Sequence, residues 1–280
     1  TDEVEMYSLF GLLLLIGANQ DRQQHARDLW SDEIGRPIYT ATMSRNRFIQ
    51  LLRFIRFDDR ETRENRRQND KFAPIRDIWT RFEKTLSSCY TPTANTTIDE
   101  MLSLFRGRCG FKVFMKDKPG KYGMLIRLIA DAEQRYVIAA EPYTGKDGAS
   151  KQDRGPTEVV KRLVSTIKGT GRNVTTDRYY TSVDLAETLW LDFKLTLVGT
   201  IQANRKHIPE KLKKTEDREL TLCLYSSKFR PPPVTLLSYC RKEKPKTLLL
   251  MLSTQHQDGE IVDNEKKKAV INMYYNANKG

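Results

Sequence analysis

The sequence predicts a mixed α/β protein in which an all-helical segment precedes a core built on a β-sheet. Hydrophobic residues recur at helical spacing through residues 1–95, and the spacing changes at Thr96 to the alternation that is typical of β-strands. Three strand-like runs then follow one another before helices begin to alternate with strands. The 280 residues are enough for two domains, or for one domain with an insertion.

The helical segment is predicted to contain four helices. Glu5–Ile16 is the most apolar and is expected to be buried, because it is shorter than the roughly 20 residues that cross a bilayer. It also has no basic leader, so neither a membrane span nor a signal peptide is expected. Gln24–Trp30 is a candidate second helix, Ser44 is placed to cap a third, and Pro74 is placed to begin a fourth. The charged stretch 58–67 between the last two helices is expected to be a loop.

The arginines of this helical segment allow two interpretations. They suit contacts with phosphate groups of a nucleic acid. They are equally compatible with a solvated helix face on which arginines are paired with neighbouring acidic residues. The sequence leaves both interpretations open.

The core is predicted to contain five strands and two helices. The predicted strands are residues 97–105, 122–130, 136–140, 173–177 and 195–200. The predicted helices are residues 156–168 and 183–191, the second with a capping box formed by Thr181 and Asp184. Three strands in succession favour an antiparallel meander, and strands that alternate with helices favour parallel pairing. This is the element order of the ribonuclease-H-like fold, in which the first and fourth strands are neighbours.

A basic, loop-rich stretch follows the fifth core strand. Three more strand-like runs come after it, at residues 220–225, 234–239 and 247–252, with three prolines at 231–233 among them. We interpret residues 205–266 as a β-rich insertion into the core that covers 96–204. The chain is expected to return to that core at 267–280, with a strand over Ala269–Tyr275.

Charge and cysteine content narrow the class of protein. The net charge of +12 and the pI near 9.5 favour a polyanionic partner such as nucleic acid, although a generic basic surface would give the same totals. The four cysteines show neither the spacing of a zinc site nor that of a disulfide framework. An intracellular, reducing compartment is therefore expected.

Two aspartates are the candidate catalytic and metal-binding residues. Asp99 lies in the first core strand, and Asp177 ends the fourth. Because these strands are expected to be neighbours, the two carboxylates are predicted to face each other and to bind Mg²⁺ or Mn²⁺, which prefer hard oxygen ligands. An aspartate among apolar strand residues is costly unless a metal or another partner compensates its charge.

A simpler interpretation of each aspartate remains open, namely an exposed carboxylate at a strand edge or a turn cap. Glu100 is expected to point to the other face of the strand from Asp99 and is the weaker candidate. Asp131 follows the second strand, where turn formation explains it as well as a catalytic role does. No histidine has the spacing of a zinc site or a catalytic triad, and Cys109 is expected to be an ordinary packed or surface thiol.

The sequence resembles the piggyBac transposase family along almost its whole length. Three features of the resemblance are the motif at Thr97–Glu100, the motif at Asn173–Asp177 and the helical motif at Arg56–Asp59. The other matching segments are Phe105–Arg108, Lys118–Gly123, Thr181–Ser182, Leu195–Thr200, Arg205–Pro209 and Met273–Asn276. Together these motifs are highly specific, whereas either short aspartate motif alone is not.

The resemblance implies a cut-and-paste DNA transposase that uses three catalytic aspartates and two Mg²⁺ or Mn²⁺ ions. Asp99 matches the first aspartate and Asp177 the second. The family's third lies in a Gly-Val-Asp segment after the motif that occupies Tyr274–Gly280 here. We therefore expect residues 1–280 to lack the third ligand and the family's C-terminal zinc-binding module, and to be inactive in strand transfer.

Partners and location follow from the same resemblance. DNA is the expected partner, as transposon ends and as TTAA target sites, and the intact protein is expected to be a nuclear homodimer. Residues 1–95 would bind DNA and dimerise. The residues expected to contact DNA are Arg106, Arg108, Lys118, Lys121, Arg178, Arg205 and Lys206.

One residue next to the predicted site departs from the family pattern. Arg178 follows Asp177 where members of the family commonly carry asparagine, and its charge is expected either to contact DNA or to weaken metal binding. A second hypothesis is a host-retained transposase derivative that keeps its basic surface but not its catalytic geometry, and that binds DNA or chromatin without cutting it. A generic ribonuclease-H-like nuclease is a more distant alternative.

Overall fold

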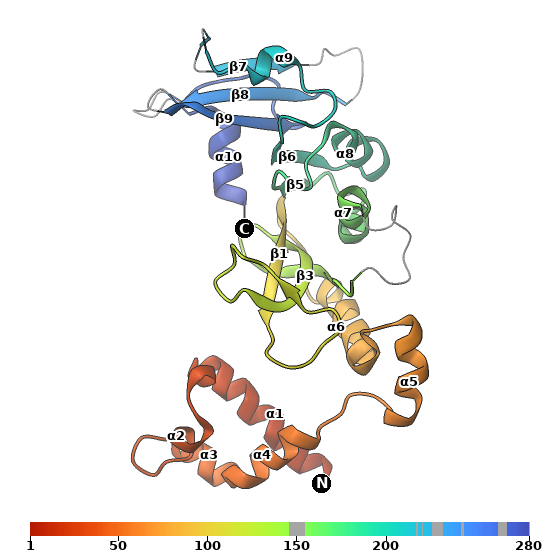
Figure 1. Cartoon of the computed structure of the whole chain (residues 1–280), viewed down its shortest axis with the longest axis vertical. Helices are drawn as coiled ribbons and strands as arrows, with labels where there is room; N and C mark the ends of the chain where they lie inside the picture. Colours follow the sequence, from red (N-terminus) through yellow and green to blue (C-terminus); the bar gives the residue numbers. More distant parts are fainter. Residues whose placement is uncertain are drawn as a thin grey trace. The chain divides into compact units, whose positions relative to one another are not determined.

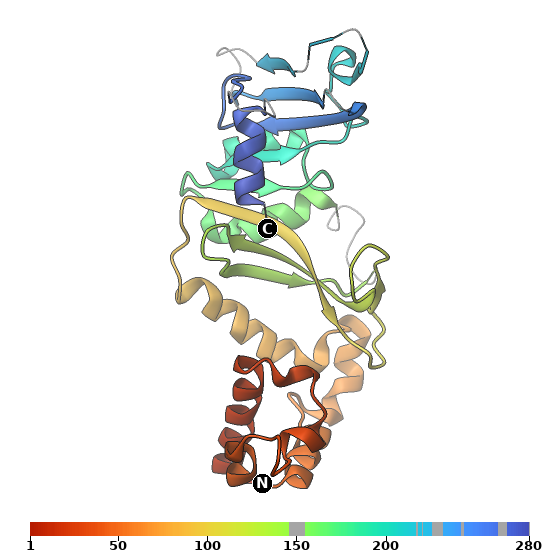
Figure 2. The same cartoon turned by 90° about the vertical axis from the view of Figure 1, so that its left-hand side faces the viewer.

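The computed structural model describes residues 1–145, 155–216, 218–219, 221–225, 232–241, 244–262 and 268–279. The chain forms two compact units, Thr1–Glu61 and Thr62–Gly280. The first is helical, and the second contains a large mixed sheet with helices on its faces (Figures 1 and 2). Among the described residues no helix is both long enough and apolar enough to cross a membrane.

The first unit is built around one small hydrophobic core. Its elements are α1 (Glu3–Ala18), η1 (Asp21–Gln23), α2 (Ala26–Leu29), α3 (Pro37–Thr42) and α4 (Arg45–Phe54). The buried core residues are Leu9, Leu12, Leu29, Tyr39, Phe48 and Leu51. Trp30 packs against two of them, with ring centroids 5.3 Å from Tyr39 and 4.7 Å from Phe48.

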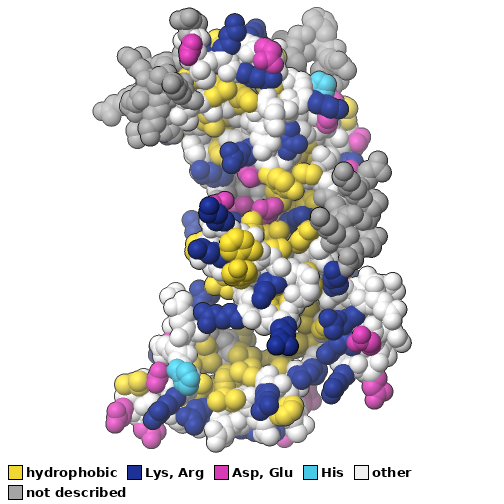
Figure 3. Space-filling model, in the orientation of Figure 1, with side chains coloured by type: hydrophobic (Ala, Val, Ile, Leu, Met, Phe, Trp, Pro, Cys, Tyr) yellow, Lys and Arg dark blue, Asp and Glu magenta, His cyan; other side chains and the backbone are white. Residues whose placement is uncertain are grey.

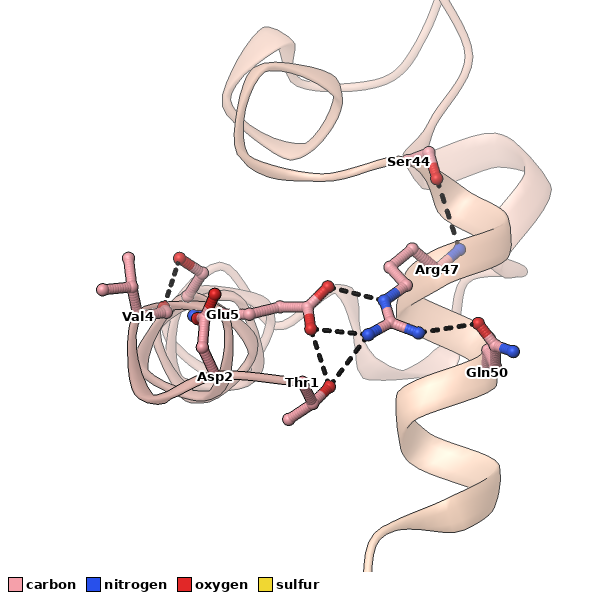
Figure 4. A network of polar contacts seen from close by, with 8 residues as sticks. Thr1, Asp2, Val4, Glu5, Ser44, Arg47 and Gln50 are labelled. Atoms are coloured by element: carbon pink, nitrogen blue, oxygen red, sulfur yellow. Dashed lines mark hydrogen bonds and ion pairs between the residues drawn. The ribbon is translucent and has the colours of Figure 1, made fainter.

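Polar contacts fix the ends of these helices. Ser44 caps α4 as predicted, because its hydroxyl accepts a hydrogen bond from the backbone N–H of Arg47. Figure 4 shows Arg47 joining α4 to α1: its Nε lies 2.5 Å from Oε1 of Glu5, and its Nη2 lies 2.6 Å from Oε2.

The short helix α3, which begins at Pro37, was not predicted from the sequence.

The charged stretch 58–67 is not the loop that the sequence pattern predicted. It contributes most of α5 (Arg60–Asn69), in which no residue is buried. Without an apolar stripe the helix gives no hydrophobic periodicity, but arginine, glutamate and glutamine favour helices. Local contacts help to form it, because Asp59 Oδ1 accepts from the backbone N–H of Glu61 at 2.9 Å.

After α5 the second unit continues with η2 (Ala73–Ile75) and α6 (Arg76–Ser88), which begins close to the predicted position. The described residues then form one sheet of nine strands in the order β2-β3-β1-β5-β6-β9-β8-β7, with β4 paired to β3. The strands are β1 (Asn95–Leu104), β2 (Val113–Phe114), β3 (Tyr122–Asp131), β4 (Val137–Pro142), β5 (Asn173–Thr176), β6 (Thr196–Thr200), β7 (Thr221–Tyr225), β8 (Thr235–Arg241) and β9 (Lys244–Ser253).

The centre of this sheet has the pairing expected for a ribonuclease-H-like fold. β1 pairs antiparallel with β3 and parallel with β5, and β5 pairs parallel with β6. The predicted antiparallel meander and the predicted proximity of the first and fourth core strands are therefore confirmed. The short strand β2 was not predicted.

Helices cover both faces of the sheet. One face carries α7 (Pro156–Val164) with η3 (Ser165–Ile167), and α8 (Val183–Thr188) with a π-helical turn at Leu189–Phe193. The other face carries α10 (Val270–Asn278), as Figure 1 shows. Successive side chains of β6 point to opposite faces of the sheet. Leu197 packs in the core on the face that carries α7 and α8, and Val198 packs in the core on the face that carries α10.

The prediction of a strand at Ala269–Tyr275 is wrong, because these residues form most of α10. Ile271 and Asn278, seven residues apart, are both buried on the same face of the helix. The position beside β6 is taken instead by β9, which pairs antiparallel with it from Val198↔Ser253 to Thr200↔Met251. A short run with several apolar residues gives little basis for choosing between strand and helix.

The three strands of the predicted insertion extend the core sheet. β8 pairs with β9, and β7 with β8. The basic stretch before them adds one helical turn, α9 (Glu210–Lys213). The start of the first predicted run at residue 220, the first proline at 231 and most of the polar loop predicted at 145–155 lie outside the described residues. The division into four functional domains stays a prediction.

Candidate active site at the ends of two parallel strands

Asp99 and Asp177 occupy neighbouring positions at one end of the parallel pair β1–β5. The register runs from Asn95↔Asn173 to Ile98↔Thr176, and each aspartate is the next residue on its chain. Because paired strands lie about 4.8 Å apart, this register brings the two side chains into one region of the sheet. The carboxyl ends of parallel strands are where ligands bind in α/β sheets.

Backbone amides hold one oxygen of each carboxylate. Asp99 Oδ1 accepts from the backbone N–H of Glu100 at 2.7 Å. Asp177 Oδ1 accepts from the N–H groups of Tyr179 at 2.9 Å and Tyr180 at 3.4 Å, within the turn that follows β5. Among the described residues, Oδ2 of each aspartate has no hydrogen-bond partner. One oxygen of each side chain is thus fixed, and the other is open to a ligand.

Both aspartates are exposed, which corrects the expectation that they lie among apolar neighbours. β5 ends at Thr176, so Asp177 already belongs to a turn, and Asp99 follows the last residue of β1 that pairs with β5. The cost of burying a carboxylate therefore does not favour a metal at this site. What favours a metal is the position of the two open carboxylates.

Tyr275 on α10 brings a phenol close to both carboxylates. Burial raises the pKa of this half-buried phenol above its ordinary value of 10.0. A hydrogen bond with Thr200 opposes the shift, and the negative charges of Asp177 and Asp99 add to it. The neighbouring Tyr274 ties α10 to the start of β1, because its hydroxyl donates to Oδ1 of Asn95. The sequence assigned no role to Tyr274 and Tyr275, because the predicted strand over Ala269–Tyr275 did not indicate that either side chain lies near the aspartates.

The turn after Asp177 is held by threonine hydroxyls against β6. Thr181 Oγ1 donates to the carbonyl oxygen of Asp177 at 2.7 Å and lies 2.7 Å from Thr176 Oγ1. A side chain at Gly199 would place its Cβ only 2.3 Å from Thr181 Oγ1, so the approach of the turn requires glycine there. Thr181 thus stabilises the turn that carries Asp177.

The cap of α8 differs from the predicted capping box. Ser182 is the N-cap residue, and its hydroxyl accepts from the N–H of Leu185 at 3.1 Å. Thr181 lies one residue too early for that role, and its hydroxyl is already engaged in the turn. The helix itself is shorter than predicted and continues as the π-helical turn.

The other acidic candidates have structural partners. Asp131 is buried, and its oxygens accept from the Tyr90 hydroxyl at 3.0 Å and from the N–H groups of Thr93, Glu133 and Gln134 at 2.6–2.9 Å. Burial raises the pKa of Asp131, but these hydrogen bonds outweigh it and lower the pKa to about 2. This residue is a turn cap. Glu100 is bound by a tyrosine hydroxyl instead, at 2.9 Å from Tyr180 Oη.

The seven basic residues singled out from the sequence fall into two groups. Arg106, Arg108, Lys118 and Lys121 lie in the segments between β1 and β3, and all are exposed except the partly buried Lys118, whose Nζ donates to the carbonyl oxygen of Glu100 at 2.9 Å. Their contact with DNA stays a prediction. Figure 3 shows lysine and arginine side chains spread over the face that it displays.

The second basic group follows β5 and β6. Arg178 and Lys206 are exposed, and Arg205 is partly buried. Arg205 Nη2 donates to the carbonyl oxygen of Tyr179 at 2.5 Å, so it joins the segment after β6 to the turn of Asp177. Arg178 is next to Asp177 along the chain, and Arg205 reaches the same turn through its contact with Tyr179. The DNA contacts of this group also stay a prediction.

The carboxylates of Asp99 and Asp177 are suitable ligands for a hard divalent cation, but they supply only part of its coordination shell. Carboxylate oxygens are the protein ligands that Mg²⁺ and Mn²⁺ prefer, and both ions keep positions for water or phosphate oxygens. The described residues contain no group of three or more histidine, cysteine, aspartate or glutamate side chains placed to hold a metal. The assignment of Asp99 and Asp177 as metal ligands stays a prediction, which the exposure and neighbouring positions of the two carboxylates support.

The mixed sheet, with two exposed carboxylates at one end of its parallel strands β1 and β5, has the arrangement of a ribonuclease-H-like core. A protein-family model described as transposase IS4 matches residues 1–280. The chain therefore belongs to the piggyBac-type transposase family.

A solved structure supports the same assignment. The cryo-EM structure of a piggyBac transposase synaptic complex with hairpin DNA matches this chain with a TM-score of 0.90 and 36% sequence identity. The match covers 99% of this chain and 57% of that one, so the chain spans little more than half of the solved protein's length. The mixed sheet and the N-terminal helices match, which confirms the predicted fold class.

Proposed function

We propose that the protein is a cut-and-paste DNA transposase that acts on transposon ends and inserts at TTAA sites. The observation that carries the proposal is the register of β1 and β5, which places Asp99 and Asp177 side by side as exposed carboxylates. The solved relative was captured as a synaptic complex with hairpin DNA, which supports DNA as the partner. The proposal extends to a nuclear homodimer.

Asp99 and Asp177 would hold divalent cations, Mg²⁺ or Mn²⁺. Bound there, such ions supply Lewis acidity that activates an attacking oxygen and stabilises a leaving one. The backbone amides fix one oxygen of each aspartate, so each side chain is oriented before a cation or DNA arrives. The raised pKa of Tyr275 keeps its phenol protonated even in mildly alkaline solution, where it can still donate a hydrogen bond to a DNA oxygen.

Basic side chains would position the DNA. Arg178 is exposed next to Asp177, Lys206 is exposed next to Arg205, and Arg106, Arg108 and Lys121 are exposed in the segments between β1 and β3. Such groups bind phosphate oxygens regardless of sequence and make the affinity depend on salt. Substituting one side chain that binds a phosphate is expected to reduce the slope of log affinity against log salt by about 0.9.

A polypeptide of residues 1–280 is expected to bind Mn²⁺ weakly and to transfer strands poorly. Two carboxylates leave most of the coordination positions of two ions to water, and the resemblance implies a third aspartate. Electron paramagnetic resonance of free Mn²⁺ measures the affinity. Strand transfer by this polypeptide at the rate of an intact family member would contradict the expectation.

The proposed reaction is tested with the whole protein and a hairpin-ended DNA that carries TTAA. Asp99→Asn and Asp177→Asn should each slow Mn²⁺-dependent hairpin opening by about a hundredfold or more, because loss even of outer-shell partners of a metal site costs 10–100-fold. Asp192→Asn is the matched control, since Asp192 is exposed and lies outside the site. Full activity of either site variant would refute the assignment.

A second candidate function is binding of DNA without cutting, in a host-retained derivative of a transposase. The observation that favours it is Arg178, whose exposed cationic side chain follows Asp177 directly. The same assay separates the two functions. DNA binding that is unchanged by Asp99→Asn and Asp177→Asn, with no hairpin opening by the wild-type protein, would support the binding function.

A further inference from the structure

The second unit contains a cavity remote from the two aspartates. Its volume is about 610 Å³, and it lies between α5, the turn at residues 72–75 and the loop after β1. Cavities of roughly 300–1,000 Å³ are typical of small-ligand sites. Phe105, in its wall, is six residues beyond Asp99, which corresponds to about 20 Å along an extended chain.

Three phenylalanines line this cavity, which we call the aromatic cavity. They are Phe72 from the turn before η2, and Phe105 and Phe111 from the loop after β1. Phe72 is buried and makes an edge contact with Phe111, with ring centroids 5.8 Å apart. The ring of Trp79 also packs against Phe72, with centroids 5.6 Å apart and the two planes nearly perpendicular. The aromatic wall is therefore anchored by α6.

Charged and polar side chains from two elements surround these rings. Arg67 on α5 and Arg108 in the loop after β1 both line the cavity, and both are exposed. Glu64 and Gln68, one turn of α5 apart, line the same side. The site thus combines flat apolar walls, two guanidinium groups and side chains that accept or donate hydrogen bonds.

We propose that the aromatic cavity binds an unstacked nucleobase of the DNA, with Arg67 and Arg108 on the flanking phosphates. The inference rests on the proposed function, since it identifies a second contact with the same DNA. Aromatic rings stack on the faces of unpaired bases, and guanidinium groups pair with phosphate oxygens. Glu64 accepts a hydrogen bond from an exocyclic amino group, which adenine, cytosine and guanine carry and thymine does not.

Charge distinguishes a nucleotide from an apolar protein segment as the occupant. An apolar segment would bury the phenylalanine rings but would leave the two guanidinium groups without anionic partners. A nucleotide satisfies both features at once, because its base is flat and apolar on its faces and its phosphate is anionic.

Cys109 provides a direct readout, because this partly exposed thiol lines the cavity. The full chain is alkylated in the presence of a duplex with one unpaired adenosine, or of a fully paired duplex of the same length, and the modification of each cysteine is measured by peptide mass spectrometry. The unpaired base should slow alkylation of Cys109 by about tenfold more than the paired duplex does, because one base stack is worth roughly that factor. Cys89, which is exposed at the end of α6, is the internal control.

A pair of substitutions tests the aromatic wall in the same DNAs. Phe111→Leu keeps an apolar side chain but removes a stacking surface, so it should weaken binding of the unpaired adenosine by about tenfold and leave the paired duplex unchanged. Phe114→Leu is the matched control, since Phe114 is exposed on β2 and packs on Tyr122 outside the cavity.

Each outcome decides between the alternatives. Equal protection of Cys109 by the two DNAs, or equal effects of the two substitutions, would overturn the inference and leave the proposed function intact. Unchanged Cys109 reactivity with either bound DNA would overturn it as well, because the cavity would then be unoccupied by the DNA. Failure of the chain to bind either DNA would contradict the proposed function itself.

Discussion

The phenol of Tyr180 donates a hydrogen bond to Oε1 of Glu100 over 2.9 Å. Glu100 follows Asp99 on β1, and the backbone N–H of Tyr180 binds Asp177. One tyrosine therefore connects the two chain segments that carry the aspartates. Burial raises the pKa of this phenol well above its usual range, and the negative charge of Glu100 adds to the effect, so Tyr180 remains a donor at all working pH values.

Tyr180→Phe should loosen this connection. Loss of a hydrogen bond to a charged group is expected to reduce the free energy of unfolding by about 1.5–3 kcal/mol. If the bond also positions the aspartates, the affinity for Mn²⁺ should fall several-fold, as measured by paramagnetic resonance in conditions where both proteins are folded. Tyr179→Phe is the control, because Tyr179 is 43% exposed and its hydroxyl makes no hydrogen bond among the described residues. A purely structural role would lower stability and leave the Mn²⁺ affinity unchanged.

The ion pair between Glu5 and Arg47 should make the first unit sensitive to acid. The hydrogen bond from Arg47 lowers the pKa of Glu5 from 4.5 to about 2, so the folded state binds this proton more weakly than the unfolded state. The pair therefore contributes its stability above pH 4.5 and loses it as the pH falls toward 2. Hydrogen exchange of α1 and α4 amides between about pH 3 and pH 6 measures the effect.

Glu5→Gln should flatten that pH dependence, because the substituted side chain does not titrate. Glu3→Gln is the control, since Glu3 occupies the same first turn of α1 and is exposed. The pair is solvent-accessible, so its effect should weaken as salt is added. An unchanged pH profile in Glu5→Gln would show that other carboxylates cause the acid sensitivity.

His256 predicts a second pH effect, in the second unit and nearer neutrality. Its Nδ1 lies 2.9 Å from Oγ of the buried Ser253, and its ring packs on Tyr274 with centroids 5.0 Å apart. Burial lowers the pKa of His256 below 6.5, although Asp258 opposes the shift. The unfolded state then binds this proton more readily, so stability is fully present above pH 6.5 and declines as the pH falls through the folded pKa.

His256→Asn should remove this dependence between about pH 5 and pH 7, as followed by thermal unfolding. His207→Asn is a suitable control, because His207 is exposed and its positive φ of 67° is a conformation that asparagine tolerates. The same decline in His256→Asn as in the wild type would locate the titrating group elsewhere.

The order of the central strands could be predicted from the sequence because each strand carries a clear local pattern. The run around Leu125 is nearly continuous in apolar residues, as expected for a strand covered on both sides, and the β-branched residues of β5 favour a strand as well. Those two patterns, together with the helices between β4 and β6, define the fold class. They were also enough to place Asp99 and Asp177 on neighbouring strands.

The errors arise where the local pattern is weak or tertiary packing decides. α5 has no buried face, so it lacks the hydrophobic periodicity that reveals a helix. The residues of α10 read equally well as a strand, and the choice depends on β9, which is more than fifteen residues away along the chain and occupies the edge of β6. The role of Tyr275 could not be inferred, because it depends on that same helix.

Arg178 leads to the last prediction, which concerns the charge beside Asp177. Its guanidinium is exposed and follows directly on the carboxylate that would hold a divalent cation, so it should repel that cation. Arg178→Asn introduces the residue that is common in the family at this position. In water, at the distance between neighbouring side chains, the repulsion between the guanidinium and a cation is about 1 kcal/mol per unit charge before screening by salt. Removing it by Arg178→Asn should therefore raise the affinity for Mn²⁺ about two- to fivefold. The gain should shrink at high salt, because exposed charges are screened.

Arg178→Lys is the control for this substitution, because it retains the charge and should leave the affinity nearly unchanged. The same variants also separate the two interpretations of Arg178. If the side chain contacts DNA phosphate, Arg178→Asn should weaken DNA binding and lower its salt dependence while it strengthens binding of Mn²⁺. If Arg178→Asn changes neither affinity, the arginine acts on neither ligand, and its charge would no longer favour a binding function without catalysis.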